Sequence, residues 1–314
     1  MEDAAPSAHI QTVSPYQNQK KAFVMNKQLD AHKAIQAIKS GMTIGIGGWG
    51  PRRKPMALVR ELLRSDVKDL TVIAYGGADV GLLCAAGKVK KVIFAFVSLD
   101  FMPLEPAFRK ARETGGIEVS EIDEGMMLLG LRAGAWGCPF IPTRVGLGTD
   151  VLRNNPDIAV IDSPYDHKEW VAMPALTPDV ALIHATCADQ RGVCQIASPD
   201  HYMDDWFARA AKHTIVSVDT MVSSEHFYDP AVARQVFWER NHTQAVVHIP
   251  GGAHPSSSDP IYGFDVEHYK DYGALIAEGG FDAWSHKYLG ESEADYQAAV
   301  GGLASIHQLA LPAY

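Results

Sequence analysis

Short apolar runs of strand length alternate with segments whose apolar residues recur at helical spacing through most of the chain. Residues 43–46 and 70–75 are typical of buried strands, and residues 54–64 between them have the pattern of an amphipathic helix. Further strands are expected at residues 91–98, 117–119, 158–161, 180–186, 214–218 and 244–249, and further helices at 103–112 and 126–136. Strands separated by helices indicate β-α-β units, so we expect an α/β fold with an open, mainly parallel sheet flanked by helices.

The two ends of the chain depart from this alternation. Residues 265–277, 281–289 and 292–306 have helical patterns with no strand between them, so we expect these helices to pack on the outside of the sheet. The first two dozen residues are polar and lack the apolar segment of a secretory signal. We therefore expect a flexible N-terminal tail at residues 1–28 and one domain at residues 29–314.

Composition and charge exclude several classes of protein. Of the 314 residues, 47% are hydrophobic and 21% are charged, which is the balance of a soluble globular protein. The net charge of −9 argues against binding to nucleic acid or to an anionic membrane, because both need clustered lysine and arginine. No apolar run reaches the ~18 residues of a membrane span. The four cysteines form no C-x-x-C pair and the histidines are scattered, so we expect free thiols in a reducing cytoplasm and no metal site.

A glycine-rich turn joins the first expected strand to the first expected helix. Residues 45–50 read GIGGWG and match the G-x-G-x-x-G pattern of dinucleotide-binding proteins. That pattern also needs an acid at the end of the second strand, where this chain has AYGG, and Trp49 is bulky for a turn that approaches a pyrophosphate. NAD binding is therefore the weaker interpretation.

Two other interpretations of the glycine-rich turn remain open. The backbone N–H groups of Gly47 and Gly48 can face an anion or a developing oxyanion at a helix start, with positive charge from Arg52, Arg53 and Lys54. The alternative is a tight turn whose basic residues are solvated.

Two acidic residues precede the expected helix at 126–136, at the carboxyl end of a strand, where open α/β sheets bind ligands. Asp123 is placed to cap the helix and Glu124 stands at its first position, so both can serve only to stabilise the helix start. In the functional interpretation Glu124 points into a cleft as a general base. That role requires burial to raise its pKa more than the helix dipole lowers it.

An arginine lies in the next connection. Residues 137–150 contain two prolines and several glycines, which predicts an ordered but irregular loop. Arg144 in this loop can bind a carboxylate or phosphate in a bidentate manner, or it can form a surface salt bridge.

Several of these segments together resemble the alpha subunits of family I CoA-transferases. The resemblance covers about residues 29–300 and rests on GIGGWG, on the YGG after the second strand, and on GCPFIPTRVGLGTD, DVALIHATCADQRG and PGGAHPS. It implies the CoA-transferase (NagB/RpiA-like) superfold, a beta subunit as partner in a heterodimer or heterotetramer, and an acyl-CoA substrate. CoA would then enter as part of the substrate, with no separate cofactor.

Within that family, longer segments resemble the alpha subunits of bacterial steroid ring-cleaving hydrolases. These are the stretch from SGMTIGIGGWG to KDLTV, together with YGGADVGLLCAAGKVKKV, FVSLD and DEGM. The resemblance implies retro-Claisen hydrolysis of a cyclic β-keto CoA thioester during cholesterol breakdown, with the catalytic glutamate at Glu124 and a substrate-binding arginine at Arg144. We expect Gly47 and Gly48 to supply the hydrogen bonds to the enolate.

Two other functions remain open for a chain of this family. In a true CoA-transferase, the resemblance implies that a nucleophilic glutamate on the beta subunit would carry the acyl group between acids. A sensor with the same fold would bind an acyl-CoA without consuming it, since fold does not fix function.

Overall fold

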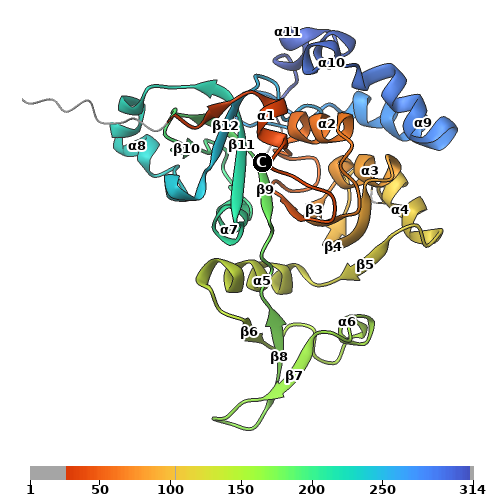
Figure 1. The fold of residues 1–314 in the computed structure, drawn as a ribbon, viewed down its shortest axis with the longest axis vertical. Coiled ribbons are helices and arrows are strands. Elements are labelled where there is room, and N and C mark those ends of the chain that lie inside the picture. The colour runs from red at the N-terminus through yellow and green to blue at the C-terminus, as the bar shows by residue number, and fades with distance from the viewer. Residues whose placement is uncertain (1–25, 103, 312–314) are drawn as a thin grey trace, which may run out of the picture.

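The main body of the molecule is a mostly parallel sheet with helices on both faces, as Figure 1 shows for the computed structural model, which describes residues 26–102 and 104–311. Every neighbouring pair in the main path of the sheet is parallel. In spatial order these strands are β1 (Gln28–Leu29), β12 (Ala245–His248), β11 (His213–Met221), β9 (Val180–Ala188), β2 (Thr43–Ile46), β3 (Leu70–Gly76), β4 (Val89–Val97) and β5 (Glu118–Glu121). The predicted fold class is confirmed.

Two hydrophobic cores form on the two faces because successive side chains of a strand point to opposite sides. In β3, Leu70, Val72 and Ala74 enter one core, whereas Ile73 and Tyr75 enter the other. The first core is covered by α1 (Ala31–Ile35), α2 (Met56–Arg64), α3 (Ala78–Ala85), α4 (Pro106–Glu113) and α9 (Val266–Trp284). The second is covered by α5 (Glu124–Trp136) and α7 (Asp204–Ala210).

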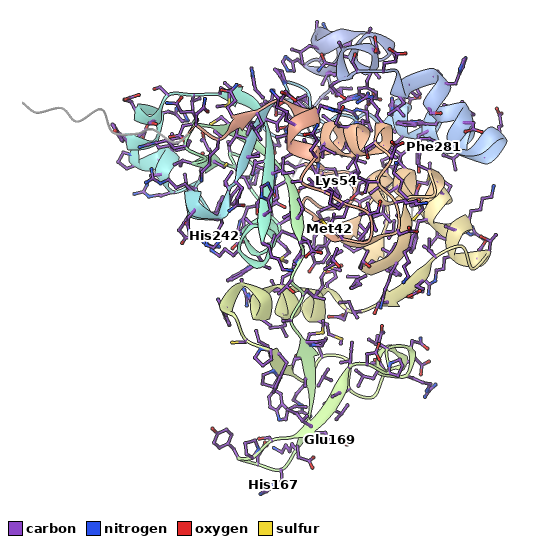
Figure 2. All side chains as sticks on the ribbon, in the orientation of Figure 1. Met42, Lys54, His167, Glu169, His242 and Phe281 are labelled. Carbon is purple, nitrogen blue, oxygen red and sulfur yellow. The ribbon has the colours of Figure 1, made fainter. Side chains whose placement is uncertain are left out.

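A small antiparallel sheet forms an arm that projects from the main body beyond α5 (Figure 1). Its strands in order are β6 (Phe140–Thr143), β8 (Glu169–Pro174) and β7 (Ala159–Asp162), and α6 (Asp150–Asn154) lies in the same segment. Figure 2 labels His167 and Glu169 near the tip of this arm and Lys54 inside the main body.

The arm corrects two sequence-based expectations. The strand at 158–161 was expected in the parallel sheet, but it pairs only within the arm, because a four-residue apolar run fits either kind of sheet. Residues 137–150 were expected to be an irregular loop, but they include β6, whose Pro142 is accepted in an edge strand.

The helices after β12 break at glycines. Gly280 has a φ of +67° inside α9, which separates the two helices expected there, and a π-helical turn at Ser285–Leu289 follows. The single helix expected at 292–306 is instead α10 (Glu293–Ala299) and α11 (Gly302–Ile306), because Gly301 and Gly302 both have positive φ.

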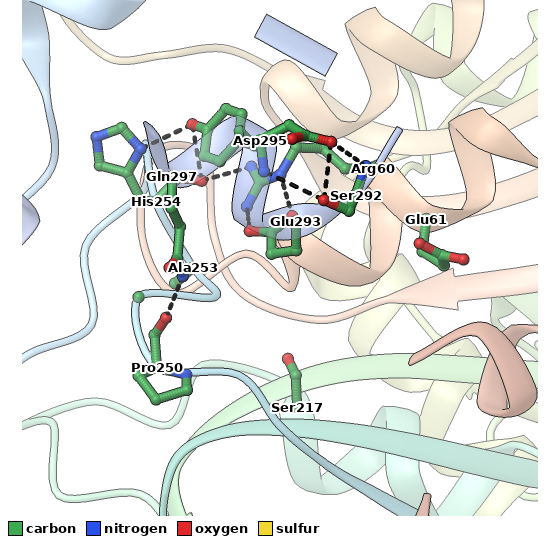
Figure 3. A network of polar contacts seen from close by, with 12 residues as sticks. Arg60, Glu61, Ser217, Pro250, Ala253, His254, Ser292, Glu293, Asp295 and Gln297 are labelled. Atoms are coloured by element: carbon green, nitrogen blue, oxygen red, sulfur yellow. Dashed lines mark hydrogen bonds and ion pairs between the residues drawn. The ribbon is translucent and has the colours of Figure 1, made fainter. Parts of the chain in front are cut away.

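Buried Arg60 of α2 ties this C-terminal region to the main body (Figure 3). Its Nε donates to Glu293 Oε2 at 2.8 Å and its Nη1 donates to the His254 carbonyl at 2.7 Å. Its guanidinium also lies 3.5 Å from the centre of the Tyr296 ring. The C-terminal helices therefore cover the sheet through a charged contact as well as through apolar burial.

The remaining elements are short. A turn at residues 189–192 joins β9 to the antiparallel strand β10 (Cys194–Gln195). The other short elements are α8 (Pro230–Ala233) and the 3₁₀ turns at Ser224–Tyr228 and Arg240–His242.

The expected N-terminal tail lies mostly outside the described residues. Lys27, within its expected bounds, donates its N–H to the Gln190 carbonyl at 2.8 Å and its Nζ to the Thr243 carbonyl at 2.6 Å. The boundary between tail and domain stays a prediction. Across the described ranges, no helix is both long enough and apolar enough to cross a membrane.

Candidate active site

The amides of the glycine-rich turn already have partners inside the protein. Gly47 donates its N–H to the Leu182 carbonyl at 2.9 Å, and Gly48 donates to Asp204 Oδ1 at 2.7 Å. The expectation that these two N–H groups face an oxyanion is therefore corrected, because in this structure they are committed to a neighbouring strand and to a buried carboxylate. Gly48 has a φ of +74°, and a Cβ at Gly47 would lie 2.4 Å from Asp204 Oδ1, so both positions require glycine.

The basic residues after the turn are also paired. Arg53 contacts Asp204 at 2.9 Å, and Lys54 contacts Asp79 at 3.0 Å, with all four side chains almost completely buried. Burial lowers the pKa of Lys54, which Asp79 opposes, and burial raises the pKa of Asp204, which Arg53 opposes. Arg52 pairs with Asp100 at 2.5 Å nearer the surface.

These ion pairs change the interpretation of the turn. The three basic residues are all paired and do not offer free positive charge to a ligand, as the sequence had suggested. Arg53 and Lys54 are not solvated either, whereas Arg52 stays partly exposed. The two buried pairs hold the turn in one shape, because a buried charge without its partner is strongly unfavourable.

Trp49 joins the turn to a group of aromatic rings. Its ring stacks on Tyr75 with centroids 4.7 Å apart and an interplanar angle of 17°, and it lies 4.9 Å from the centroid of Phe96. Tyr202 stacks against it at 6.1 Å. Tyr75 is completely buried, whereas Trp49, Phe96 and Tyr202 keep part of their surface exposed.

The first turn of α5 carries Glu124. Asp123 caps the helix, because its carboxylate accepts the Gly125 N–H at 2.7 Å. The Tyr75 hydroxyl donates to the main-chain oxygen of Glu124 at 3.0 Å. Among the described residues the Glu124 carboxylate has no hydrogen-bond or ion-pair partner, so Asp123 alone performs the capping role and Glu124 is left available.

The electrostatic surroundings of Glu124 suit a base. Partial burial raises its pKa above the usual value, and the neighbouring negative charge of Asp123 raises it further. The side chain is nevertheless exposed on this chain alone. A carboxylate with a raised pKa and no partner can accept a proton from water once a substrate or a second protein covers it.

Arg144 lies close to the same end of α5. Its neighbour Val145 packs against the first helical turn, since a Cβ at Gly125 would lie 3.7 Å from Val145 Cγ2. Arg144 is exposed and, within the described part of the chain, forms no ion pair. The structure therefore brings the loop that carries Arg144 to Glu124, and it does not show the surface salt bridge that was the alternative.

A cleft of about 610 Å³ opens next to this region. It runs along β4 beyond the point where β5 stops pairing, with α4 on its other side, and it includes Glu121, three residues before Glu124. Buried Glu105 lines it, and burial raises the pKa of this carboxyl to about 7. In the described ranges no cluster of three or more potential metal ligands occurs.

Sequence reasoning missed Tyr75, Phe96, Asp79 and Asp204. Asp204 is 156 residues from Gly48 in the sequence and lies in a helix that was not predicted. The only available signal was local: Tyr75 and Phe96 both lie near the carboxyl ends of predicted strands, where ligand sites form in such sheets.

Comparisons with known proteins identify the family of the chain and relatives of its fold. The chain matches the sequence profile of the family described as "Coenzyme A transferase" over residues 29–238. It is 44% identical over 283 residues to the cholesterol ring-cleaving hydrolase IpdA subunit of Mycobacterium tuberculosis, which covers 88% of this chain and 97% of that protein. The protein of the same name from Rhodococcus jostii is 44% identical over 285 residues, covering 88% and 96%. The crystal structure of glutaconate coenzyme A-transferase from Acidaminococcus fermentans superposes with a TM-score of 0.84 at 27% identity, covering 91% of this chain and 96% of that chain.

Proposed function

This chain belongs to the coenzyme A transferase family, and from that premise we propose that it is the alpha subunit of a heteromeric hydrolase that opens the ring of a cyclic β-keto CoA thioester. The observation that carries the proposal is the Glu124 carboxylate, which is unpartnered among the described residues, has a raised pKa and stands at the start of a helix. Its setting in a chain 44% identical to subunits named for cholesterol ring cleavage supports a substrate derived from a steroid ring.

The reaction needs one base and one water molecule. Glu124 removes a proton from water, whose oxygen bonds to the ring ketone carbon. The bond between this carbon and the carbon next to the thioester then breaks, and its electron pair forms the thioester enolate. The enolate carbon takes up the proton held by Glu124, so the ketone becomes a carboxylic acid and the thioester stays intact. A positioned base contributes on the order of 100- to 10,000-fold to such a step.

Arg144 would bind the carboxylate of the substrate or product, since its guanidinium is exposed and unpaired within the described part of the chain. The hydrogen bonds to the enolate oxygen come from groups other than Gly47 and Gly48, whose N–H groups are committed. Glu124 and Arg144 are both exposed on the single chain, which supports a site completed by the beta subunit. CoA is part of the substrate, and we propose no resident cofactor.

A true CoA-transferase is the second candidate, favoured by the likeness to the glutaconate enzyme. An acyl-CoA sensor would bind the thioester and leave it unchanged. The four cysteines are free, which supports the reducing cytoplasm as the compartment for any of these functions.

Water labelled with heavy oxygen distinguishes the candidates. The chain is co-purified with its beta subunit and given a cyclic β-keto CoA thioester, and the product is analysed by mass spectrometry. Hydrolysis places one labelled oxygen in the new carboxylate without any acceptor acid. Product that forms only when an acceptor acid is added would establish transfer instead, and unchanged thioester would indicate a sensor.

A further inference from the structure

The ring centroids of Phe96 and Tyr202 lie 4.9 Å and 6.1 Å from that of Trp49, and all three side chains stay partly exposed. Tyr75 links this group to the first turn of α5, which carries Glu124. We call Trp49, Phe96 and Tyr202 the aromatic platform. We propose that the aromatic platform binds the apolar, alicyclic part of the CoA thioester. This inference rests on the proposed function and deepens it by naming the residues that select the ring of the substrate.

Tyr75 connects the platform to the catalytic carboxylate. Its ring stacks on Trp49 at 4.7 Å, and its hydroxyl donates to the main-chain oxygen of Glu124 at 3.0 Å. The carboxylate of Glu124 is near enough to add to the rise that burial causes in the pKa of the Tyr75 hydroxyl. A substrate ring that lies against the platform would therefore place its ketone near the Glu124 carboxylate.

The platform is rigid before any substrate arrives. Asp204 holds the turn through Gly48 and Arg53, and the Arg53 guanidinium lies 4.9 Å from the centre of the Tyr202 ring. Tyr202 has a positive φ of 51°, and its N–H donates to Asp200 Oδ1 at 2.6 Å, which fixes the loop that presents its ring. A surface held in this way loses little conformational entropy when a ligand binds.

The charge of the surroundings favours an apolar ring over a short polar acyl chain. In the turn, Arg53 and Lys54 are buried and neutralised by Asp204 and Asp79, and the less buried Arg52 pairs with Asp100. They have no free charge for a second carboxylate, whereas aromatic faces gain from burying C–H surface. The platform therefore selects by apolar contact.

The test compares two thioesters bound to the assembled protein in a Glu124→Gln background, where binding is measured without turnover. One probe is the CoA thioester of a cyclohexanone carboxylic acid with the ketone β to the thioester, and the other is acetoacetyl-CoA. Trp49→Leu removes the indole, and Phe96→Leu provides a second variant in case the first does not fold. Trp136→Leu is the matched control, because Trp136 is 60% exposed and contacts Trp206 instead.

We expect Trp49→Leu to weaken binding of the cyclic thioester about ten-fold and of acetoacetyl-CoA by less than about two-fold. Phe96→Leu should also weaken binding of the cyclic thioester more than binding of acetoacetyl-CoA. Trp136→Leu should leave the ratio of the two affinities unchanged. An equal loss for both thioesters, or no loss for either, in every variant that folds would overturn the proposal. Turnover by Glu124→Gln would instead contradict the proposed function, while the ratio of affinities would still test the platform.

Discussion

The Tyr75 hydroxyl holds the main-chain oxygen of Glu124 at 3.0 Å, so a residue of the central sheet fixes the first turn of the helix that carries the base. Tyr75 is completely buried and is stacked on Trp49 from the glycine-rich turn. Tyr75 therefore links the turn to the helix start that carries the Glu124 carboxylate, although Trp49 and Glu124 are about 75 residues apart in the sequence.

Removing only this hydroxyl tests its positioning role. Tyr75→Phe keeps the ring stack, so we expect the thermal unfolding temperature to change little and kcat to fall about ten-fold with KM nearly constant. Steady-state kinetics of the assembled enzyme check this. Tyr288→Phe, which loses a hydrogen bond to Asp271 far from the site, is the control. An unchanged kcat for Tyr75→Phe would show that the hydroxyl does not position Glu124.

Asp204 is expected to stabilise the fold through the turn. Asp204→Ala leaves the Arg53 guanidinium buried without its partner and removes the acceptor of the Gly48 N–H. We expect the free energy of unfolding to fall by about 3–5 kcal/mol, measured by urea denaturation. Asp100→Ala removes the more exposed partner of Arg52 and should cost at most about 1 kcal/mol. Equal losses in the two variants would contradict a special role for the buried pair.

Glu105 predicts a pH dependence of stability. Burial raises the pKa of the folded-state carboxyl to about 7 from its usual value of 4.5, so between these pH values the folded state holds a proton that the unfolded state releases. The free energy of unfolding therefore falls as pH rises through this window, by about 1–3 kcal/mol from this group.

Glu105→Gln cannot ionise and should lose that part of the pH dependence, whereas exposed Glu113→Gln should retain it. Urea denaturation on either side of the window measures the difference. If wild type and Glu105→Gln followed parallel curves, the raised pKa would be wrong.

Arg144 is expected to act on substrate binding alone. It is exposed and has no ion-pair partner in the described ranges, so Arg144→Ala should leave the unfolding temperature unchanged. Loss of a charge-assisted hydrogen bond should raise KM about ten-fold, and Arg144→Lys should recover only part of it, because lysine lacks the planar fork. A normal KM for Arg144→Ala would remove it from the site.

Local patterns in the sequence were sufficient to predict most of the parallel sheet and the helix start at Glu124. The apolar runs of β3 and β9 are visible in consecutive residues, so each strand can be predicted without knowledge of its partners. The family resemblance, in turn, pointed to Glu124 and Arg144. The arm could not be assigned, because its short strands satisfy the requirements of either sheet. The Gly47 and Gly48 N–H groups donate to Leu182 and Asp204, which are distant in the sequence. Such long-range hydrogen bonds leave no periodic signal in the sequence.

The distinction between Asp123 and Glu124 was also beyond the sequence. Both residues suit a helix N-terminus, and only the structure shows that Asp123 accepts the Gly125 N–H. Because Asp123 caps the helix, the Glu124 carboxylate is available to act as a base.

In the proposed reaction the Glu124 carboxylate is the base of ring opening. The most direct measurement is the turnover of a cyclic β-keto CoA thioester by the assembled enzyme with Glu124→Gln, beside Asp123→Asn as a neighbouring control. We expect Glu124→Gln to lose at least about 100-fold in kcat while still assembling and binding the thioester, and Asp123→Asn to keep most activity. Turnover by Glu124→Gln within a few-fold of wild type would contradict it.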